Sequence, residues 1–121
     1  MSDQPLRDRR ILIVEDEWYL ATELKLELAK VGAIVLGPVP SVVKALALVS
    51  AEPKIDAAVV DMNLSGEMAY LVADALAERK TPFVITTGYL DGNLDARYPG
   101  VLRCDKPVEF SKLARMLASV L

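Results

Sequence analysis

The sequence contains no histidine and a single cysteine, Cys104. The missing histidine excludes a Ser-His-Asp or Cys-His catalytic system, a His-ligated zinc ion and a phosphohistidine on this chain. One cysteine excludes an internal disulfide bond and a thiolate cluster. Any phosphohistidine chemistry in which the protein takes part therefore uses a histidine of a partner.

A surplus of positive charge is also missing. The 121 residues carry 14 Lys and Arg against 17 Asp and Glu, a net charge of −3, so direct binding to nucleic acid is not expected. No apolar run approaches the roughly 18 residues of a membrane span, and the polar first ten residues lack the apolar core of a signal peptide. We therefore expect a cytoplasmic protein without membrane contact.

Five short apolar runs alternate with segments of helical periodicity, which predicts one α/β domain over residues 10–121 after a frayed polar lead-in at 1–9. Strands are predicted at 11–14, 33–36, 55–60, 83–85 and 101–104. Helices are predicted at 18–31, 41–51, 67–79 and 109–121. The stretch 89–100 contains Gly92, Pro99 and Gly100 and predicts a loop or one or two turns.

This alternation implies a doubly wound parallel sheet with helices on both faces and right-handed crossovers. An open sheet of this kind binds its ligand at the carboxyl ends of the strands, at the topological switch point. In the flavodoxin-like order 2-1-3-4-5, the first and third strands are neighbours at that point.

Polar residues end the predicted strands at this edge. Glu15 and Asp16 end the first strand, Asp61 ends the third, Thr87 ends the fourth, and Lys106 follows the fifth. Three carboxylates in one place repel each other unless a cation intervenes, and Mg2+ suits oxygen ligands of this kind. With a lysine and a hydroxyl beside them, these are the groups that phosphoryl transfer onto an aspartate requires.

Each residue taken alone also has a structural interpretation. Asp61 stands where a helix cap is common, and Glu15-Asp16 fits the acidic first turn of a helix. Thr87-Gly88 and Lys106-Pro107 are typical of turns. Their joint occurrence at the ends of the right strands favours a functional site.

Four segments resemble the receiver domain of bacterial two-component response regulators, and the resemblance covers residues 10–121. They are ILIVEDE at 11–17, VVDMNL at 59–64, Thr87-Gly88 and Lys106-Pro107. The resemblance implies that Asp61 accepts a phosphoryl group from a sensor histidine kinase or a phosphotransfer protein. It also implies a Mg2+ ion held by the side chains of Asp16 and Asp61, the backbone carbonyl of Asn63 and, through water, Glu15.

The same resemblance implies roles for the residues after the fourth and fifth strands. Thr87 and Lys106 would bind the phosphoryl group, Gly88 would leave room for it, and the Lys106-Pro107 peptide would be cis. Phosphorylation would then switch a protein-binding surface around residues 88–104 for a downstream partner, with a homodimer as a further possibility. Activity beyond self-catalysed phosphoryl transfer and autodephosphorylation is not expected.

Two features depart from the family's pattern. Arg103 stands three residues before Lys106, where an aromatic switch residue is usual, and Tyr89 is the candidate to replace it. The poor helical signal at 89–100 predicts a short or degraded fourth helix.

Alternatives remain at this stage. A receiver fold that is never phosphorylated would act as a constitutive adaptor. A haloacid-dehalogenase-type phosphohydrolase would need a second aspartate where Asn63 stands, and would carry its nucleophile after the first strand. Trp18 is either a packed or half-exposed aromatic at a helix start, or a lip over the site or a partner contact. With no output domain after Leu121, we expect either a stand-alone regulator or a fragment of a longer one.

Overall fold

The computed structural model describes residues 4–88 and 98–121 and contains a five-stranded parallel sheet in the order β2-β1-β3-β6-β7. Its strands are β1 (Arg10–Val14), β2 (Ile34–Val39), β3 (Ala57–Asp61), β6 (Phe83–Thr87) and β7 (Leu102–Asp105). All neighbouring strands in this sheet pair in parallel. The predicted flavodoxin-like fold and strand order are confirmed.

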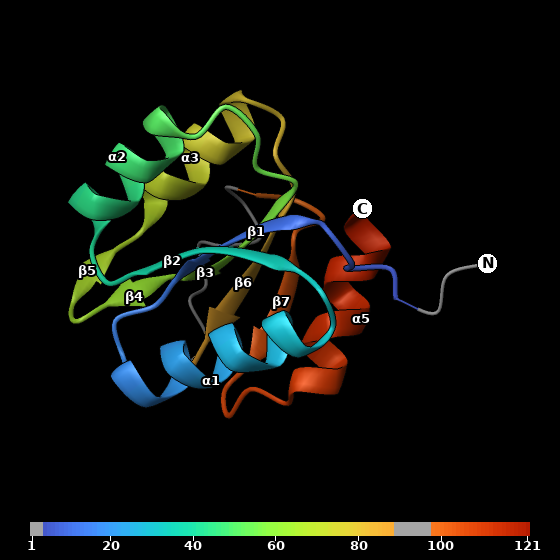
Figure 1. Ribbon diagram of the computed structural model, residues 1–121. Helices are drawn as coiled ribbons and strands as arrows, with labels where there is room; N and C mark the ends of the chain where they lie inside the picture. The colour runs from blue at the N-terminus through green and yellow to red at the C-terminus, as the bar shows by residue number, and fades with distance from the viewer. Residues whose placement is uncertain (1–3, 89–97) are drawn as a thin grey trace.

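The sheet is covered on both faces (Figure 1). Helices α1 (Trp18–Lys30) and α5 (Phe110–Val120) lie on one face, and α2 (Val42–Ala51) and α3 (Tyr70–Glu78) lie on the other. Successive residues of a strand point to opposite faces. Ile11 and Ile13 therefore pack into the core beneath α1 and α5, and Leu12 and Val14 into the core beneath α2 and α3. This two-sided burial explains the uninterrupted apolar runs.

Strand β2 is longer than predicted. It was expected to end at Leu36, but it continues through Gly37 and Pro38 to Val39, with a cis Gly37-Pro38 peptide and a register shift against β1. A proline is tolerated here because β2 is an edge strand, where a missing N–H breaks no ladder. The extension brings Val39 O to accept a hydrogen bond of 3.0 Å from the N–H of Glu15.

The predicted start of the third helix at Glu67 is wrong. Residues 63–68 form an antiparallel hairpin of β4 (Asn63–Leu64) and β5 (Glu67–Met68), and α3 begins at Tyr70. Ser65 and Gly66 form the two-residue turn, with φ of +53° and +93°. Positive φ at both central positions is the signature of a tight hairpin turn. The hairpin lies at the end of the sheet where β1 and β3 stop (Figure 1).

The polar lead-in is not frayed over its described residues. Leu6 is buried in the core beneath α1 and α5, and the N–H of Asp8 donates to Gly32 O at 2.8 Å. Tyr89 and most of the predicted loop at 89–100 lie outside the described residues. Among the helices that the structure describes, none is long and apolar enough to cross a membrane.

Candidate functional site

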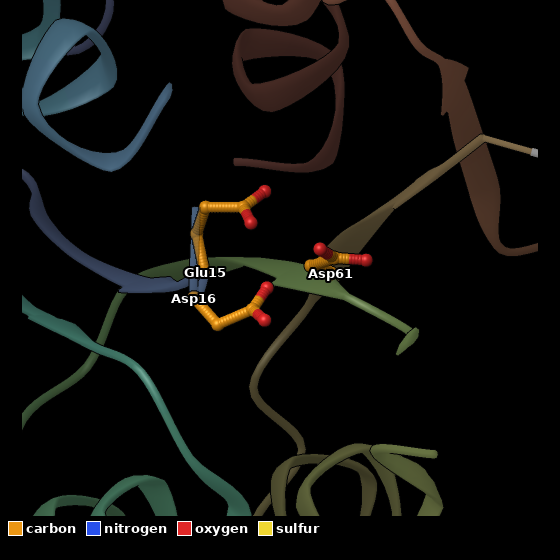
Figure 2. Close-up of side chains that lie close together, drawn as sticks. All are labelled: Glu15, Asp16 and Asp61. Atoms are coloured by element: carbon orange, nitrogen blue, oxygen red, sulfur yellow. The ribbon is translucent and has the colours of Figure 1, made fainter. Parts of the chain in front are cut away.

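Three acidic side chains meet where β1 and β3 end. Glu15 and Asp16 directly follow β1, and Asp61 is the last residue of β3. Each offers a carboxylate oxygen that lies within 4.8 Å of the others. Figure 2 shows the carboxylates of Glu15 and Asp16 turned toward Asp61 from the end of the neighbouring strand. Because β1 and β3 are adjacent and parallel, the fold brings together acids that are 45 residues apart in the chain.

Lys106 reaches this cluster from the end of β7, the edge strand that lies beyond β6. Its Nζ donates a hydrogen bond of 2.8 Å to Asp61 Oδ2 and lies 3.3 Å from Glu15 Oε1. Its backbone N–H donates to Thr87 O at 2.8 Å, which holds the residue after β7 against the end of β6. The Lys106-Pro107 peptide is cis, the conformation that the resemblance implied.

Asp61 is held through both of its carboxylate oxygens. Oδ2 accepts from Lys106, and Oδ1 accepts a hydrogen bond of 3.1 Å from the backbone N–H of Asn63. The side chain is only 4% exposed. Asp61 is thus a buried carboxylate with a fixed orientation, and carboxylates are among the side chains that act as nucleophiles.

Burial sets the electrostatics of the site. It raises the pKa of Glu15 to about 7, helped by its interaction with Asp61 and opposed by the N–H of Glu17 and by Lys106. Burial lowers the pKa of Lys106, but the hydrogen bond and the attraction to Asp61, together with Glu15, more than offset this, so the pKa lies above its ordinary value. Lys106 pairs with Glu15 and Asp61, and Asp16 adds a third carboxylate to the cluster, so its acidic groups outnumber the ammonium group.

This excess of acidic groups and the donor set fit a hard divalent cation. The three acids provide only oxygen ligands, and Glu15 Oε1 is a buried oxygen that has an ion pair with Lys106 but no hydrogen bond among the described residues. Mg2+ prefers oxygen donors and usually takes one or two carboxylates plus waters. The residues present therefore fit the predicted Mg2+ site.

Three other predicted site residues are described on or directly after β6 and β7. Thr87 ends β6 in register with Asp105. At Gly88, a Cβ atom would meet nothing nearer than Lys106 Cδ at 4.0 Å, so the position opens toward the lysine. Arg103 lies on β7 in register with Ile85. Tyr89 lies outside the described residues.

Three features of the site were missed or misjudged in the sequence. Ser65 Oγ donates a hydrogen bond to Asp16 Oδ2, although Ser65 lies between the predicted strand at 55–60 and the predicted helix at 67–79 and was given no role. Thr86 lies beside Asp61 in register, and its buried hydroxyl has no hydrogen-bond partner among the described residues. Trp18 is 70% exposed, which is more than the packed or half-exposed position expected of it, and its ring contacts that of Tyr19. The Ser65-Gly66 dipeptide was the available signal for the hairpin, but two-residue strands leave no alternation to detect.

The chain is similar to solved structures over its whole length. No protein-family model matches it, and none of the curated proteins matches it. Among solved structures, SdrG from Sphingomonas melonis Fr1 is 40% identical, with 99% of this chain and 98% of that chain covered and a TM-score of 0.80. SdrG in its BeF3-activated conformation, with the source given as Pseudomonas melonis Fr1, is 37% identical over 100% of both chains, with a TM-score of 0.75.

Two more distant structures share the fold. A response regulator receiver protein from Sinorhizobium medicae WSM419 is 23% identical, with 95% of each chain covered and a TM-score of 0.84. The response regulator TrrA from Thermotoga maritima, solved in complex with Mg2+ and BeF, is 22% identical, with 93% of this chain and 99% of that chain covered and a TM-score of 0.79. The acidic cluster, its lysine and these similarities agree: the chain belongs to the receiver domains of response regulators.

Proposed function

We propose that this receiver domain is a phosphorylation-controlled switch in which Asp61 is the phosphoacceptor. The observation that carries this proposal is the setting of Asp61: buried, held by Lys106 at 2.8 Å, and within 4.8 Å of two further carboxylates. Among the described residues of the cluster, Asp61 makes the shorter contact with Lys106, at 2.8 Å against 3.3 Å for Glu15.

The metal ligands follow from the same arrangement. Asp16 and Asp61 would hold Mg2+ through their side chains, Asn63 through its backbone carbonyl and Glu15 through water. Bound Mg2+ neutralises negative charge on the oxygens of the phosphoryl group that is transferred.

The chain's own residues account for the transfer. A carboxylate oxygen of Asp61 forms a bond to phosphorus, and the phosphorus–nitrogen bond of a partner's phosphohistidine breaks, so that the imidazole leaves. The donor belongs to a partner because this chain has no histidine. Lys106 and Thr87 then bind phosphoryl oxygens through their ammonium and hydroxyl groups, and Gly88 leaves the space for them.

An exposed aromatic pair marks the approach to this site. Trp18 and Tyr19, at the start of α1, are 70% and 76% exposed, and their rings meet edge to face at a centroid distance of 5.2 Å. A histidine kinase or phosphotransfer protein has to reach Asp61 over this edge of the sheet. Exposed aromatic residues are typical anchors of protein interfaces, so the pair is part of the docking surface in our proposal.

The output of the switch is a surface at residues 88–104. Thr87 O accepts from Lys106 N–H, so a phosphoryl group that draws in the Thr87 hydroxyl and Lys106 acts on the ends of β6 and β7 together. Strand β7 is an edge of the sheet, where a change is open to a downstream protein partner. The domain thus signals by binding and turns over no separate substrate.

Intact mass spectrometry after incubation with acetyl phosphate tests the proposal. Wild type is expected to gain about 80 Da in the presence of Mg2+ and nothing in the presence of a chelator, and Asp61→Asn is expected to gain nothing. A wild type that never gains mass would instead be a constitutive adaptor. Continued release of phosphate over many turnovers would indicate a phosphohydrolase.

A further inference from the structure

The hairpin of β4 and β5 contacts the acidic cluster through the side chain of Ser65. Ser65, at the tip of the hairpin, donates its hydroxyl hydrogen to Asp16 Oδ2. The two residues are 49 positions apart in the chain. No strand pairing joins them, because the hairpin forms a separate two-stranded sheet.

The backbone at the tip favours a residue other than serine. Ser65 has φ of +53°, a conformation that Gly, Asn and Asp adopt more readily. Next to it, Gly66 has φ of +93°, and a Cβ there would have nothing within 4 Å. The side chain of Ser65 is exposed and fills no core space. Its visible contribution is therefore the hydrogen bond to Asp16.

The hairpin is held firmly enough to position that hydroxyl. Asn63 pairs with Met68, and its Oδ1 accepts a hydrogen bond of 2.7 Å from the N–H of Gly66. At the base, the N–H of Ala69 donates to Met62 O at 2.8 Å. Buried Leu64 anchors the hairpin to the core beneath α2 and α3.

A chain of hydrogen bonds consequently links two acids of the site. The N–H of Asn63 donates to Asp61 Oδ1, the side chain of Asn63 holds the turn, and Ser65 in the turn donates to Asp16. Each carboxylate oxygen has two lone pairs, so Asp16 accepts from Ser65 and still has lone pairs for a metal ion.

We propose that Ser65 is a positioning residue that orients the Asp16 carboxylate for Mg2+ and couples the β4–β5 hairpin to the metal site. This inference rests on the proposed Mg2+ site. Groups that hydrogen-bond to a metal ligand fix its orientation, and their loss typically weakens metal binding about tenfold or more.

Mg2+ titration of the full chain, followed by the fluorescence of Trp18, tests this inference. Ser65→Gly removes the hydroxyl and suits the positive φ, so the fold is kept. We expect Mg2+ affinity about tenfold below wild type, with a thermal midpoint without Mg2+ close to that of wild type. Ser111→Ala is the matched control, because Ser111, on α5, also donates its hydroxyl to an exposed carboxylate, Glu109 Oε1 at 3.2 Å, just before the helix. Its Mg2+ affinity should equal that of wild type.

The Asp16→Ala background separates positioning from a structural role. Ser65→Gly should not weaken Mg2+ binding further there, because the hydroxyl acts through Asp16. Equal affinity of Ser65→Gly and wild type would overturn the inference while leaving the metal site intact. A lower midpoint without Mg2+ and unchanged affinity would show a structural role only. Absence of Mg2+ binding by wild type would overturn the metal site itself, and this inference with it.

Discussion

Lys106 Nζ lies 2.8 Å from Asp61 Oδ2, although strand β6 separates β3 from β7 in the sheet. The lysine spans this distance because its backbone is tied to the end of β6 through Thr87 O. Among the described residues, Lys106 is the cationic side chain that forms ion pairs with buried Asp61 and Glu15. This ion pair therefore lies at the atoms that the proposed phosphorylation would change.

Replacing Lys106 measures how much the acidic cluster lowers the free energy of unfolding when it has no ammonium partner. Lys106→Met keeps the aliphatic length but leaves Asp61 and Glu15 without their ammonium partner. We expect the free energy of unfolding at pH 8 to fall by roughly 1–3 kcal/mol, measured by urea denaturation without metal. Lys30→Met is the control, since Lys30 pairs with Glu27 on the surface of α1 and should change stability by less than about 0.5 kcal/mol. Similar small losses in both variants would contradict this picture.

The raised pKa of Glu15 predicts how stability depends on pH in metal-free protein. The pKa is about 7 in the folded state against an ordinary value of 4.5, so the folded state binds this proton more tightly. The contribution of Glu15 to stability is then fully present below pH 4.5 and is lost as pH rises through 7, by up to about 3 kcal/mol. Asp16, Asp61 and Lys106 face this carboxyl, and no histidine titrates in the same window.

Glu15→Gln isolates this contribution. The amide cannot ionise, so the loss of stability between pH 5 and pH 8, measured by urea denaturation in a chelator, should largely disappear. An equally steep pH dependence in wild type and Glu15→Gln would show that another group is responsible.

Two buried threonines give opposite predictions. The Thr86 hydroxyl has no hydrogen-bond partner among the described residues, whereas Thr81 Oγ1 donates to Ile55 O at 3.5 Å. Thr86→Val keeps the shape and removes an unsatisfied hydroxyl, so it should raise stability by about 1 kcal/mol. Thr81→Val should lower it by about the same amount. Calorimetric midpoints that fall for both variants would show that Thr86 has a partner in solution.

Phosphorylation should change the mobility of one edge of the domain. Hydrogen exchange with and without beryllofluoride should alter protection at residues 83–105, because Thr87 and Lys106 act on β6, β7 and the segment between them. Tyr89 is expected to carry this change in place of an aromatic residue at Arg103. Asp61→Asn should show no response. Changes confined to α1 and α2 would disprove this switch surface.

The sequence was most informative where both faces of an element are buried. The apolar runs at 11–14, 55–60 and 83–85 indicate parallel strands that are covered on both faces, and the polar residues after them are expected to meet at one edge of the sheet. Asp16 and Asp61 do meet there, and Lys106, which follows the shorter run at 101–104, pairs with Asp61. Their proximity follows from chain order and parallel pairing, which are encoded locally.

Features that depend on tertiary partners were harder to predict. The turn at Ser65-Gly66 joins strands too short to show a period, and the continuation of β2 through Pro38 is allowed only because that strand lies at an edge. Leu6 is buried because it packs against core residues that are distant in the sequence. The unpaired state of the Thr86 hydroxyl could not be predicted, because residue type alone does not show whether a buried hydroxyl has a hydrogen-bond partner among the described residues.

Locating the phosphoryl group on the chain is the most direct test of the central claim. After incubation with acetyl phosphate and Mg2+, borohydride reduces an aspartyl phosphate to homoserine, which tandem mass spectrometry assigns to a residue. The account predicts homoserine at position 61 and none in Asp61→Asn. Homoserine at Asp16, a reduced glutamyl product at Glu15, or no reduction product in phosphodonor-treated wild type would contradict it.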